Sequence, residues 1–510
     1  MPESALTSAQ QMLQRTLLAK VYDVAEVTPL QSMTKLGQRL GLEVQLKRED
    51  CQPVHSFKLR GAYNCIAHLS QAQLDAGVVA ASAGNHAQGV ALAAKSRGCS
   101  AVIVMPTTTP DIKVDAVVNL GAEVVLHGDS FDQANAHAKS LSEQQGRSYI
   151  HPFDDLNVIA GQATVAQEMV QQNRQLQLVF VPVGGGGLAA GMAAYYKALL
   201  PHVKVIGVES QESACLQQAL NAGEPVDLSQ VGLFADGVAV KRIGEKTFAL
   251  AQECLDSVVT VTSDEICAAV KDIFEDTRAI AEPSGALALA GLKRYLAETD
   301  EEYQQAAAVL SGANVNFHSL RYVSERCELG EGREAVLAVQ IPERPGSFLA
   351  FCQMLGGRAV TEFNYRFSSR EQAQVFVGLR TSPEQSGLQD LIERLQAADY
   401  RVLDLSQDEI AKQHIRYMVG GRPPVEIKER LYSFEFPEHP GALERFLTTL
   451  GGRWNISLFH YRNHGAAFGR VLVGFEVPDA EQSAFQQFLT ELGLVYQDES
   501  TSPGYQAFLS

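Results

Sequence analysis

A series of short, continuous apolar segments between residues 20 and 315 most constrains the fold. Five are rich in valine or isoleucine and end in turn residues: "GVVAASAG" (77–84), "SAVIVMP" (100–106), "AEVVLHG" (122–128), "QLVFVPVGGGG" (177–187) and "VKVIGVES" (203–210). Segments with apolar residues at helical spacing lie between them, for example 87–96 and 188–200. Continuous apolar strands alternating with helices indicate a parallel sheet that is buried on both faces. We therefore expect an α/β fold with a two-lobed, doubly wound core.

After about residue 330 the pattern changes to an internal repeat. "IPERPGSFLAFCQMLGGRAVTEFNYRF" (341–367) is similar to "FPEHPGALERFLTTLGGRWNISLFHYRN" (436–463), and Pro345-Gly346 matches Pro440-Gly441 at an offset of 95 (440 − 345). Each copy has a strand pattern before it and a strand, helix and strand after it, which predicts two βαββαβ, ferredoxin-like units. The expected divisions are an α/β domain over 1–325, repeats over 333–405 and 428–505, and a linking helix and turn over 406–427.

Composition excludes several classes of protein. The 510 residues have a formal net charge of −17, which argues against binding to nucleic acid or to an anionic membrane. No apolar run approaches the roughly 18–20 residues of a membrane helix, and the first residues do not resemble a secretory signal. The eight cysteines are scattered without a C-x-x-C pair, so we expect reduced thiols, no metal site and a cytoplasmic protein.

Lys58 has unusual neighbours for a lysine in a soluble protein. It lies between Phe57 and Leu59, directly before Gly61-Ala62 and a predicted helix. An apolar setting lowers the pKa of a lysine, and a neutral lysine can form a Schiff base with an aldehyde. Taken alone, Lys58 could equally be a surface lysine before a helix.

The loop "ASAGNHAQGVALAA" (81–94) is a second candidate, because Ser82, Gly84 and Asn85 directly precede a helix. Free N–H groups at a helix start bind anions such as a carboxylate, whereas the alternative is a simple helix cap.

The loop "VPVGGGGLAAGMAA" (181–194) has four consecutive glycines after an apolar strand, as expected of a phosphate cradle. Gly184, Gly186 and Ala189 also fit a dinucleotide fingerprint, with Glu209 twenty residues beyond Ala189 (209 − 189). An NAD-dependent dehydrogenase therefore remains an alternative, although it gives no role to Lys58 or to the loop at 82–86.

Ser311 ends the strand pattern in "VLSGANVN" (309–316), where its hydroxyl could face a site or only stabilise a turn. Together, a lysine for an aldehyde, a phosphate cradle and a serine for a ring nitrogen match the three ends of pyridoxal phosphate.

The motifs "SFKLRGA" (56–62), "SAGNHAQG" (82–89), "GGGGL" (184–188) and "SGANV" (311–315) give the chain a resemblance to the fold-type II pyridoxal-phosphate enzymes. With its doubled tail, the chain resembles more narrowly the biosynthetic threonine deaminases with ACT-like regulatory units. This resemblance implies the pyridoxal-phosphate-dependent elimination and deamination of L-threonine to 2-oxobutanoate and ammonia, the first step of isoleucine biosynthesis. L-Serine is a further possible substrate, and a homotetramer is implied.

The resemblance also implies roles for individual residues. Lys58 would hold the cofactor covalently and act as the catalytic base, and Phe57 would lie beside the ring. Asn85 would bind the 3′-oxygen of the cofactor, and Ser311 would bind its ring nitrogen. The phosphate would be bound by Gly184, Gly185, Gly186, Gly187 and Leu188. The substrate carboxylate would contact Ser82, Gly84 and His86, although His86 has an equally plausible structural role.

The roles of two acidic residues are left open. Glu282 in "AIAEPSGALA" (279–288) is either a further residue beside the ring or, as we prefer, a helix-start acid before Pro283. Glu209 binds a cation in some relatives, but Cys215 stands where the second acid would be, so no metal is assigned.

The resemblance implies that isoleucine inhibits the enzyme through the tail and that valine opposes it. Loops at Pro345-Gly346 and Pro440-Gly441 would face Asn364, Tyr365, His460 and Tyr461, which we expect at the allosteric site. Other interpretations are a tail that only assembles subunits, a serine racemase or serine dehydratase, and a non-enzymatic amino-acid sensor with a degenerate core.

Overall fold

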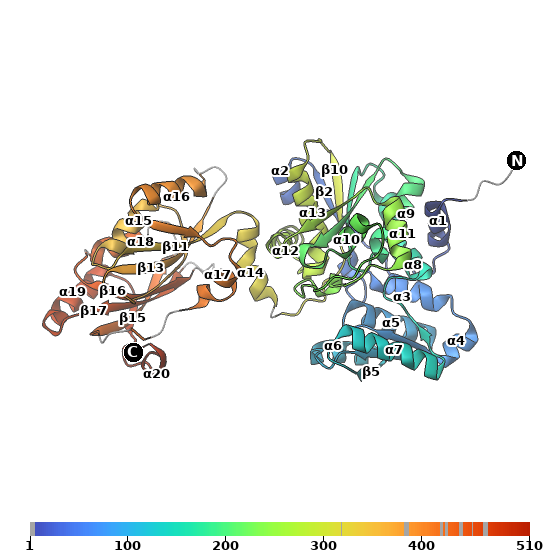
Figure 1. Ribbon diagram of the computed structural model, residues 1–510, viewed down its shortest axis with the longest axis horizontal. Helices are drawn as coiled ribbons and strands as arrows, with labels where there is room; N and C mark the ends of the chain where they lie inside the picture. The colour runs from blue at the N-terminus through green and yellow to red at the C-terminus, as the bar shows by residue number, and fades with distance from the viewer. Residues whose placement is uncertain are drawn as a thin grey trace. The chain divides into compact units, whose positions relative to one another are not determined.

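The structure, a computed structural model, divides into two compact units, Met1–Gly330 and Glu331–Ser510 (Figure 1). It describes residues 6–317, 319–381, 387–418, 422–423, 427–437, 442–450, 452–462 and 468–509. Each unit is described by itself below.

The larger sheet of the first unit has the strand order β1-β2-β10-β7-β8-β9. These strands are β1 (Leu30–Ser32), β2 (Glu43–Arg48), β10 (Gln305–Leu310), β7 (Leu178–Pro182), β8 (Lys204–Ser210) and β9 (Ser257–Val261). All neighbours are parallel except β1, which pairs antiparallel with β2. Successive β7 residues enter opposite cores: Val179 and Val181 belong to one apolar cluster and Leu178 and Phe180 to another. A sheet buried on both faces explains why its strands are continuously apolar.

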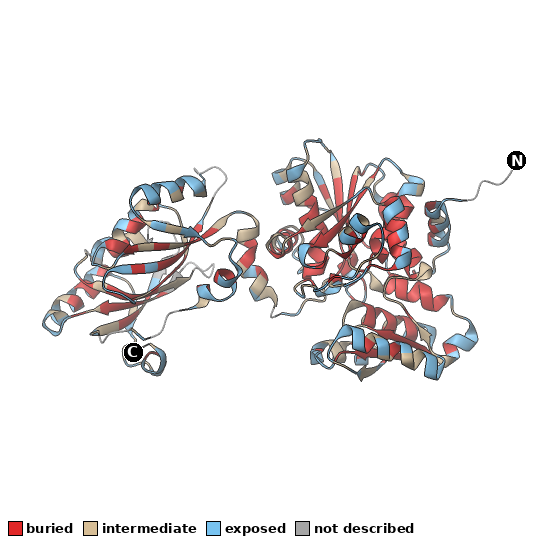
Figure 2. Cartoon of the chain, in the orientation of Figure 1, coloured by how far each residue is buried: buried red, intermediate tan, exposed pale blue. Residues whose placement is uncertain are grey.

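The smaller sheet has the order β5-β4-β3-β6 and is entirely parallel. Its strands are β3 (Val78–Ala81), β4 (Ala101–Met105), β5 (Glu123–Leu126) and β6 (Ser148–Tyr149). The two sheets form the two expected lobes. Figure 2 shows their central strands buried and the outer faces of the surrounding helices exposed.

Helices connect the strands and cover both sheets. They are α1 (Ser8–Leu17), α2 (Thr34–Leu40), α3 (Lys58–Ala67), α4 (Gln71–Ala76), α5 (Asn85–Arg97), α6 (Asp111–Asn119), α7 (Phe131–Gln145), α8 (Leu156–Gln172), α9 (Gly187–Leu199), α10 (Cys215–Ala222), α11 (Glu245–Cys254), α12 (Ser263–Thr277), α13 (Pro283–Glu298) and α14 (Ser319–Gly330). Helix α5 begins directly after β3 and α9 directly after β7, so both glycine-containing loops follow the carboxyl ends of strands.

The second unit has one eight-stranded sheet in the order β14-β11-β13-β12-β16-β17-β15-β18. Its strands are β11 (Glu334–Pro342), β12 (Val360–Arg366), β13 (Gln372–Arg380), β14 (Arg401–Asp404), β15 (Glu429–Pro437), β16 (Asn455–Arg462), β17 (Phe468–Glu476) and β18 (Tyr496–Asp498). Each half places its strands in the ferredoxin-like order 4-1-3-2, and the halves join where β12 pairs with β16. The expected fold class, with two ACT-like repeats, is confirmed.

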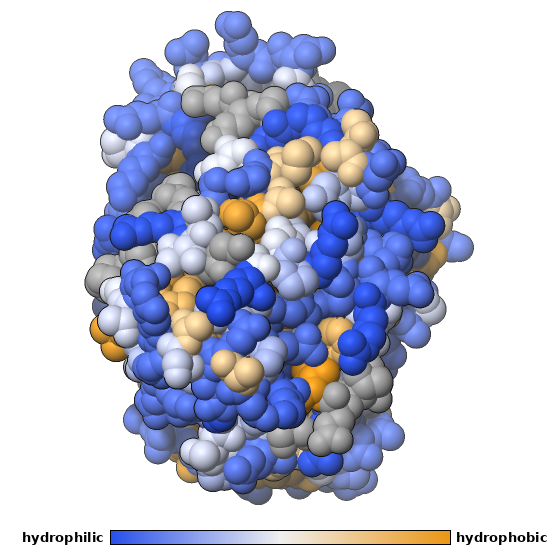
Figure 3. Space-filling view, turned by 90° about the vertical axis from the view of Figure 1, so that its left-hand side faces the viewer, coloured by the Kyte–Doolittle hydropathy of each residue, from blue (hydrophilic) through white to orange (hydrophobic). Residues whose placement is uncertain are grey.

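The helices of this unit are α15 (Ser347–Met354), α16 (Leu388–Ala397), α17 (Glu409–Gln413), α18 (Ala442–Leu450), α19 (Gln482–Leu492) and α20 (Pro503–Phe508). The expected linking helix is only α17 followed by a short 3₁₀ turn, Ile415–Tyr417. Of the stop signal at 420–424, only Arg422 and Pro423 are described. Figure 3 shows a mainly hydrophilic face of this unit with apolar side chains in small, separate groups. None of the described helices of the chain is long and apolar enough to cross a membrane.

Candidate active site

Lys58 is the first residue of α3, and contacts with distant segments fix its backbone. The N–H of Phe57 donates to the carbonyl oxygen of Ser311 at 3.2 Å, which ties the start of α3 to the end of β10. A Cβ on Gly89 of α5 would lie 3.2 Å from the carbonyl group of Lys58. This glycine therefore permits the close approach of α3 and α5.

The amine of Lys58 lies in an apolar, largely enclosed place. Its Nζ atom is 3.5 Å from the carbonyl oxygen of Pro152 and 5.3 Å from the centre of the Phe57 ring. Burial lowers the pKa of Lys58 to about 8, although the charge of Glu282 acts in the opposite direction. An appreciable fraction of the amine is therefore neutral near pH 7, as attack on an aldehyde requires.

The glycine loop joins β7 to α9. Gly186 has φ +87°, which side-chain-bearing residues rarely adopt, and a Cβ on Gly184 would lie 2.9 Å from Cα of Val238. Within the described residues, the N–H groups of Gly184 to Leu188 have no protein acceptor. Unpaired N–H groups at the start of a helix form a site for an anion, and a phosphate group fits it.

The loop before α5 contains the residues expected at the substrate carboxylate. The Oγ atom of Ser82 accepts a hydrogen bond from the N–H of Gly84 at 3.2 Å. His86 is buried, its Nε2 lies 3.0 Å from the carbonyl oxygen of Ile150, and its Nδ1 has no partner. Burial lowers the pKa of His86 to about 3, so the imidazole is neutral. The side chain therefore fits a structural role, which leaves the N–H of His86 for an anion.

Ser311 lies at the end of β10 and is 4% exposed. Its hydroxyl donates to the carbonyl oxygen of Ser284 at 3.3 Å, while its own carbonyl oxygen accepts from Phe57. The structure therefore brings the Lys58 and Ser311 segments together at one edge of the sheet.

Glu282 lies at the start of a helix before Pro283, as the preferred interpretation expects, but its side chain also contacts another candidate site residue. Glu282 is the N-cap residue of α13, but its side chain makes no capping hydrogen bond. Its Oε1 instead accepts a hydrogen bond of 2.6 Å from Nδ2 of Asn85. Burial, with the charge of Asp236, raises the pKa of Glu282 to about 7. The sequence could not show this, because the contact joins residues 197 positions apart.

Glu209 has a structural role. It is fully buried at the end of β8, and its two oxygens accept from the N–H groups of Leu216 and Gln217 at 2.8 Å each, which stabilises the start of α10. Its carboxylate is therefore occupied and unsuited to a ribose. The described residues contain no group of three or more His, Cys, Asp or Glu that could hold a metal.

Sequence reasoning missed the loop at 151–154 and Asn314. Pro152 contacts Lys58, and Phe153 packs on the glycine loop: a Cβ on Gly187 would lie 3.2 Å from Phe153, and one on Gly185 would overlap its ring. The loop therefore connects Lys58 to the phosphate cradle. The available signal was "HPFDD" (151–155), an aromatic residue and a proline directly after a strand.

In the regulatory unit, the four expected residues lie on two faces of the sheet. Asn364 lies opposite His460 in the β12–β16 pair, and the Nδ2 atom of Asn364 donates to the carbonyl oxygen of Arg416 at 2.9 Å. Tyr365 and Tyr461 lie on the other face, with the apolar core. The hydroxyl of Tyr365 donates to Glu343, which precedes the Pro345-Gly346 loop. Pro440 and Gly441 lie outside the described residues.

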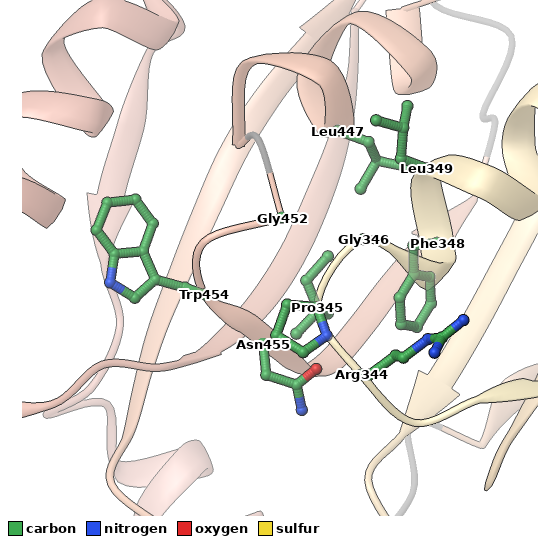
Figure 4. Close-up of a pocket in the computed structure, with 10 residues that line it drawn as sticks. Arg344, Pro345, Gly346, Phe348, Leu349, Leu447, Gly452, Trp454 and Asn455 are labelled. Atoms are coloured by element: carbon green, nitrogen blue, oxygen red, sulfur yellow. The ribbon is translucent and has the colours of Figure 1, made fainter.

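A pocket of about 250 Å³, including the part open to solvent, lies between the two repeats (Figure 4). Its lining residues are Arg344, Pro345, Gly346, Phe348, Leu349, Leu447, Gly452, Trp454, Asn455 and Ile456. The two glycine loops touch, because a Cβ on Gly452 would lie 3.3 Å from Cα of Gly346. At its rim, Asn455 donates to Glu343 at 2.8 Å.

Comparison with protein families agrees with this geometry. Residues 21–312 match the model of the pyridoxal-phosphate dependent enzymes, and residues 325–415 and 420–509 match the C-terminal regulatory domain of threonine dehydratase. The expected cofactor is confirmed, and an NAD-dependent dehydrogenase is not supported.

Individual relatives cover the whole chain. It is 60% identical over 507 residues to the biosynthetic L-threonine dehydratase IlvA of Pasteurella multocida, covering 99% of both chains. It is 59% identical to that of Escherichia coli K12, covering 100% of this chain and 99% of the other. Among solved structures, the processed form of threonine deaminase isoform 2 from Solanum lycopersicum has 49% identity and a TM-score of 0.62, covering 64% of this chain and 95% of that one. The chain thus belongs to the pyridoxal-phosphate-dependent threonine dehydratases with a C-terminal regulatory domain.

Proposed function

We propose that this chain is a threonine ammonia-lyase that converts L-threonine to 2-oxobutanoate and ammonia, the first step of isoleucine biosynthesis. The proposal rests on one observation above all: the desolvated amine of Lys58 and a loop of N–H groups without a protein acceptor contact the same segment, Pro152 and Phe153. The relatives of highest identity described above are named for the same activity.

The cofactor would be held by residues from four loops. Lys58 would bind its aldehyde carbon covalently, and Phe57 would lie beside its ring. Asn85 would donate to its 3′-oxygen, and Ser311 would contact its ring nitrogen. Its phosphate would be bound by the N–H groups of Gly184, Gly185, Gly186, Gly187 and Leu188. When bound, pyridoxal phosphate withdraws electrons from Cα of an amino acid, which acidifies the Cα proton.

Lys58 would then act as the general base that removes the Cα proton. A lysine whose pKa lies near 8 combines a neutral fraction with adequate basicity, as general base catalysis requires. The substrate carboxylate would bind at the start of α5, through the N–H of His86 and through Ser82 and Gly84, whose N–H would exchange the Ser82 hydroxyl for the carboxylate. The start of a helix favours an anion, so this site needs no charged side chain.

The direct test is to locate the cofactor. The purified chain should absorb visible light, and borohydride reduction followed by peptide mapping should place the label on Lys58. Threonine-dependent release of 2-oxobutanoate should accompany this result. A label at another lysine would contradict the assignment, and turnover without a visible chromophore would contradict the proposal as a whole.

We further propose that the pocket between the repeats binds isoleucine as inhibitor and valine as the opposing effector. Phe348, Leu349, Leu447 and Ile456 would surround a branched aliphatic side chain. Arg344 is exposed at the rim and could pair with a carboxylate, and Glu343 could pair with an ammonium group. Of the four residues expected from the sequence, Tyr365 would act on this site through its hydrogen bond to Glu343, and Tyr461 lies on the same face of the sheet.

Filling the pocket tests its role. Leu447→Trp should abolish inhibition by isoleucine while uninhibited turnover stays unchanged, because the added ring occupies the apolar space. The matched control is Leu403→Trp, since Leu403 on β14 is exposed and lies outside the pocket. Unchanged inhibition of the Leu447→Trp variant would show that the effector binds elsewhere.

Four further expectations stand as predictions. The domain limits would be 1–325, 333–405 and 428–505 with a linker at 406–427, the assembly would be a homotetramer, and the enzyme would be cytoplasmic. L-Serine would be a second substrate, which comparison of kcat/KM for L-threonine and L-serine would measure.

A further inference from the structure

Three side chains from three separate loops form a hydrogen-bonded chain beside Lys58. Asn85 begins α5, Glu282 precedes α13 and Asn314 follows β10. Nδ2 of Asn314 lies 2.7 Å from Oδ1 of Asn85, and Nδ2 of Asn85 lies 2.6 Å from Oε1 of Glu282.

The backbone determines the direction of every hydrogen bond in this chain. Nδ2 of Asn314 also lies 2.8 Å from the carbonyl oxygen of Val54, which can only accept. The amide nitrogen of Asn314 must therefore face Val54, and it donates its second hydrogen to Asn85. Oδ1 of Asn85 is then the acceptor, so Nδ2 of Asn85 faces Glu282. A carbonyl or carboxylate oxygen of Glu282 accepts in either protonation state.

This directionality leaves Asn85 with one unused donor. An asparagine amide has two N–H bonds, and Glu282 uses one of them. The amide cannot turn over, because Oδ1 would then face Glu282 and Nδ2 would face the donor of Asn314. The remaining N–H of Asn85 is therefore fixed before any ligand binds.

Gly312, two residues before Asn314, gives the carboxyl group of Glu282 the space it needs beside Asn85. A Cβ on Gly312 would lie 2.6 Å from Oε1 of Glu282 and 3.2 Å from the carbonyl oxygen of His55. A side chain at residue 312 would displace the carboxyl group from Asn85. The glycine of the "SGAN" motif (311–314) thus gives space for the acceptor of Asn85.

We propose that Glu282 and Asn314 are positioning residues that lock the amide of Asn85 with one N–H directed at the 3′-oxygen of the cofactor. The proposal rests on the proposed role of Asn85 in cofactor binding. Glu282 is a carboxyl group in an enclosed site, and its raised pKa of about 7 agrees with weak competition from solvent for its oxygens. A preorganised donor loses less entropy on binding than an amide free to rotate.

The test measures the affinity of the full-length apoenzyme for pyridoxal phosphate by visible absorbance. Glu282→Ala should weaken binding about tenfold, as expected for one hydrogen bond in an enclosed site. Gly312→Ala should have a similar effect, because its Cβ displaces the same carboxyl group. Glu282→Gln should stay within about threefold of the native value, since its amide oxygen can still accept from Asn85. The control is Asp236→Asn, which removes the neighbouring negative charge and should leave affinity unchanged.

A double-mutant cycle separates this proposal from the role of Asn85. Asn85→Ala should weaken binding, and adding Glu282→Ala should weaken it no further. Native affinity in Asn85→Ala would refute the role of Asn85 itself. If Asn85→Ala weakens binding but Glu282→Ala does not, or if the effects of the two substitutions add, the positioning role is refuted. Equal losses in Glu282→Gln and Glu282→Ala would also refute it, and thermal unfolding of each apoprotein identifies a variant that fails to fold.

Discussion

The two units build their sites in opposite ways. In the catalytic unit, the candidate site lies at the ends of buried parallel strands, and side chains such as Asn85 and His86 are fixed by hydrogen bonds to distant loops. In the regulatory unit, the pocket lies where loops of two antiparallel repeats meet, and its walls are mainly apolar. The first arrangement preorganises donors for a reaction, as electrostatic catalysis requires.

The second arrangement suits control. Two loops from different repeats touch at Gly346 and Gly452, and neither glycine has a side chain in the contact. A ligand controls an enzyme only if it binds two conformations with different affinity. A pocket between two halves provides that difference more easily than a pocket enclosed in one rigid core. The predictions below test this contrast.

The largest effect is expected at the amine. Lys58→Ala should reduce turnover by at least about 10³-fold, because it removes both the cofactor attachment and the general base. Lys95→Ala is the matched control, since Lys95 is an exposed lysine in the last turn of α5. Steady-state measurement of 2-oxobutanoate release compares the two. Turnover of Lys58→Ala above one tenth of the native rate would remove the basis of the proposed mechanism.

A second test compares buried and exposed ion pairs. Arg60, on α3 two residues after Lys58, pairs with Glu49 at 2.7 Å and with Glu168 at 2.6 Å, and all three side chains are almost fully buried. Arg60→Leu leaves the buried carboxylate of Glu49 without its cation, whereas Glu168 keeps Lys47 at 2.6 Å, and it should destabilise the catalytic unit by about 3–5 kcal/mol. Chemical unfolding would measure this loss. The exposed pair of Lys428 and Asp479 in the regulatory unit gives the control, and Lys428→Ala should leave the unfolding midpoint unchanged.

The difference between local patterns and contacts between distant loops explains which features could be predicted from the sequence. The strand pattern predicted a two-lobed parallel-sheet core, and the repeat predicted two βαββαβ units, because these depend on apolar periodicity within short segments. Gly184 to Gly187 and Ser311 could be predicted because each stands at the end of a predicted strand, and Lys58 because of its apolar neighbours and the predicted helix after it. Asn314 and the direction of the Glu282 side chain were not accessible, because they depend on contacts between loops 197 to 260 residues apart.

A third prediction concerns the pH dependence of cofactor attachment. Only the neutral form of Lys58 attacks an aldehyde, and its pKa is lowered to about 8. The rate at which the apoenzyme gains visible absorbance should therefore rise about tenfold per pH unit below pH 8 and level off above it. Stopped-flow mixing across pH 6.5–9.5 would measure this.

Glu282→Gln should move the midpoint to lower pH, because the charge of Glu282 raises the pKa of Lys58. A midpoint near 10 in the native chain would mean that the amine is exposed to solvent, contrary to the enclosed site described here.

The smallest effect compares two asparagines on the two faces of the regulatory sheet. Asn455 lines the pocket and donates to Glu343, whereas Asn364 lies on the other face and donates to the carbonyl oxygen of Arg416. Asn455→Ala removes one hydrogen bond at the rim, so the isoleucine concentration for half-maximal inhibition should rise about three- to tenfold. Asn364→Ala should leave it unchanged. The reverse result would place the effector on the Asn364 face, which the sequence alone also allows, and would show that the pocket only joins the two repeats.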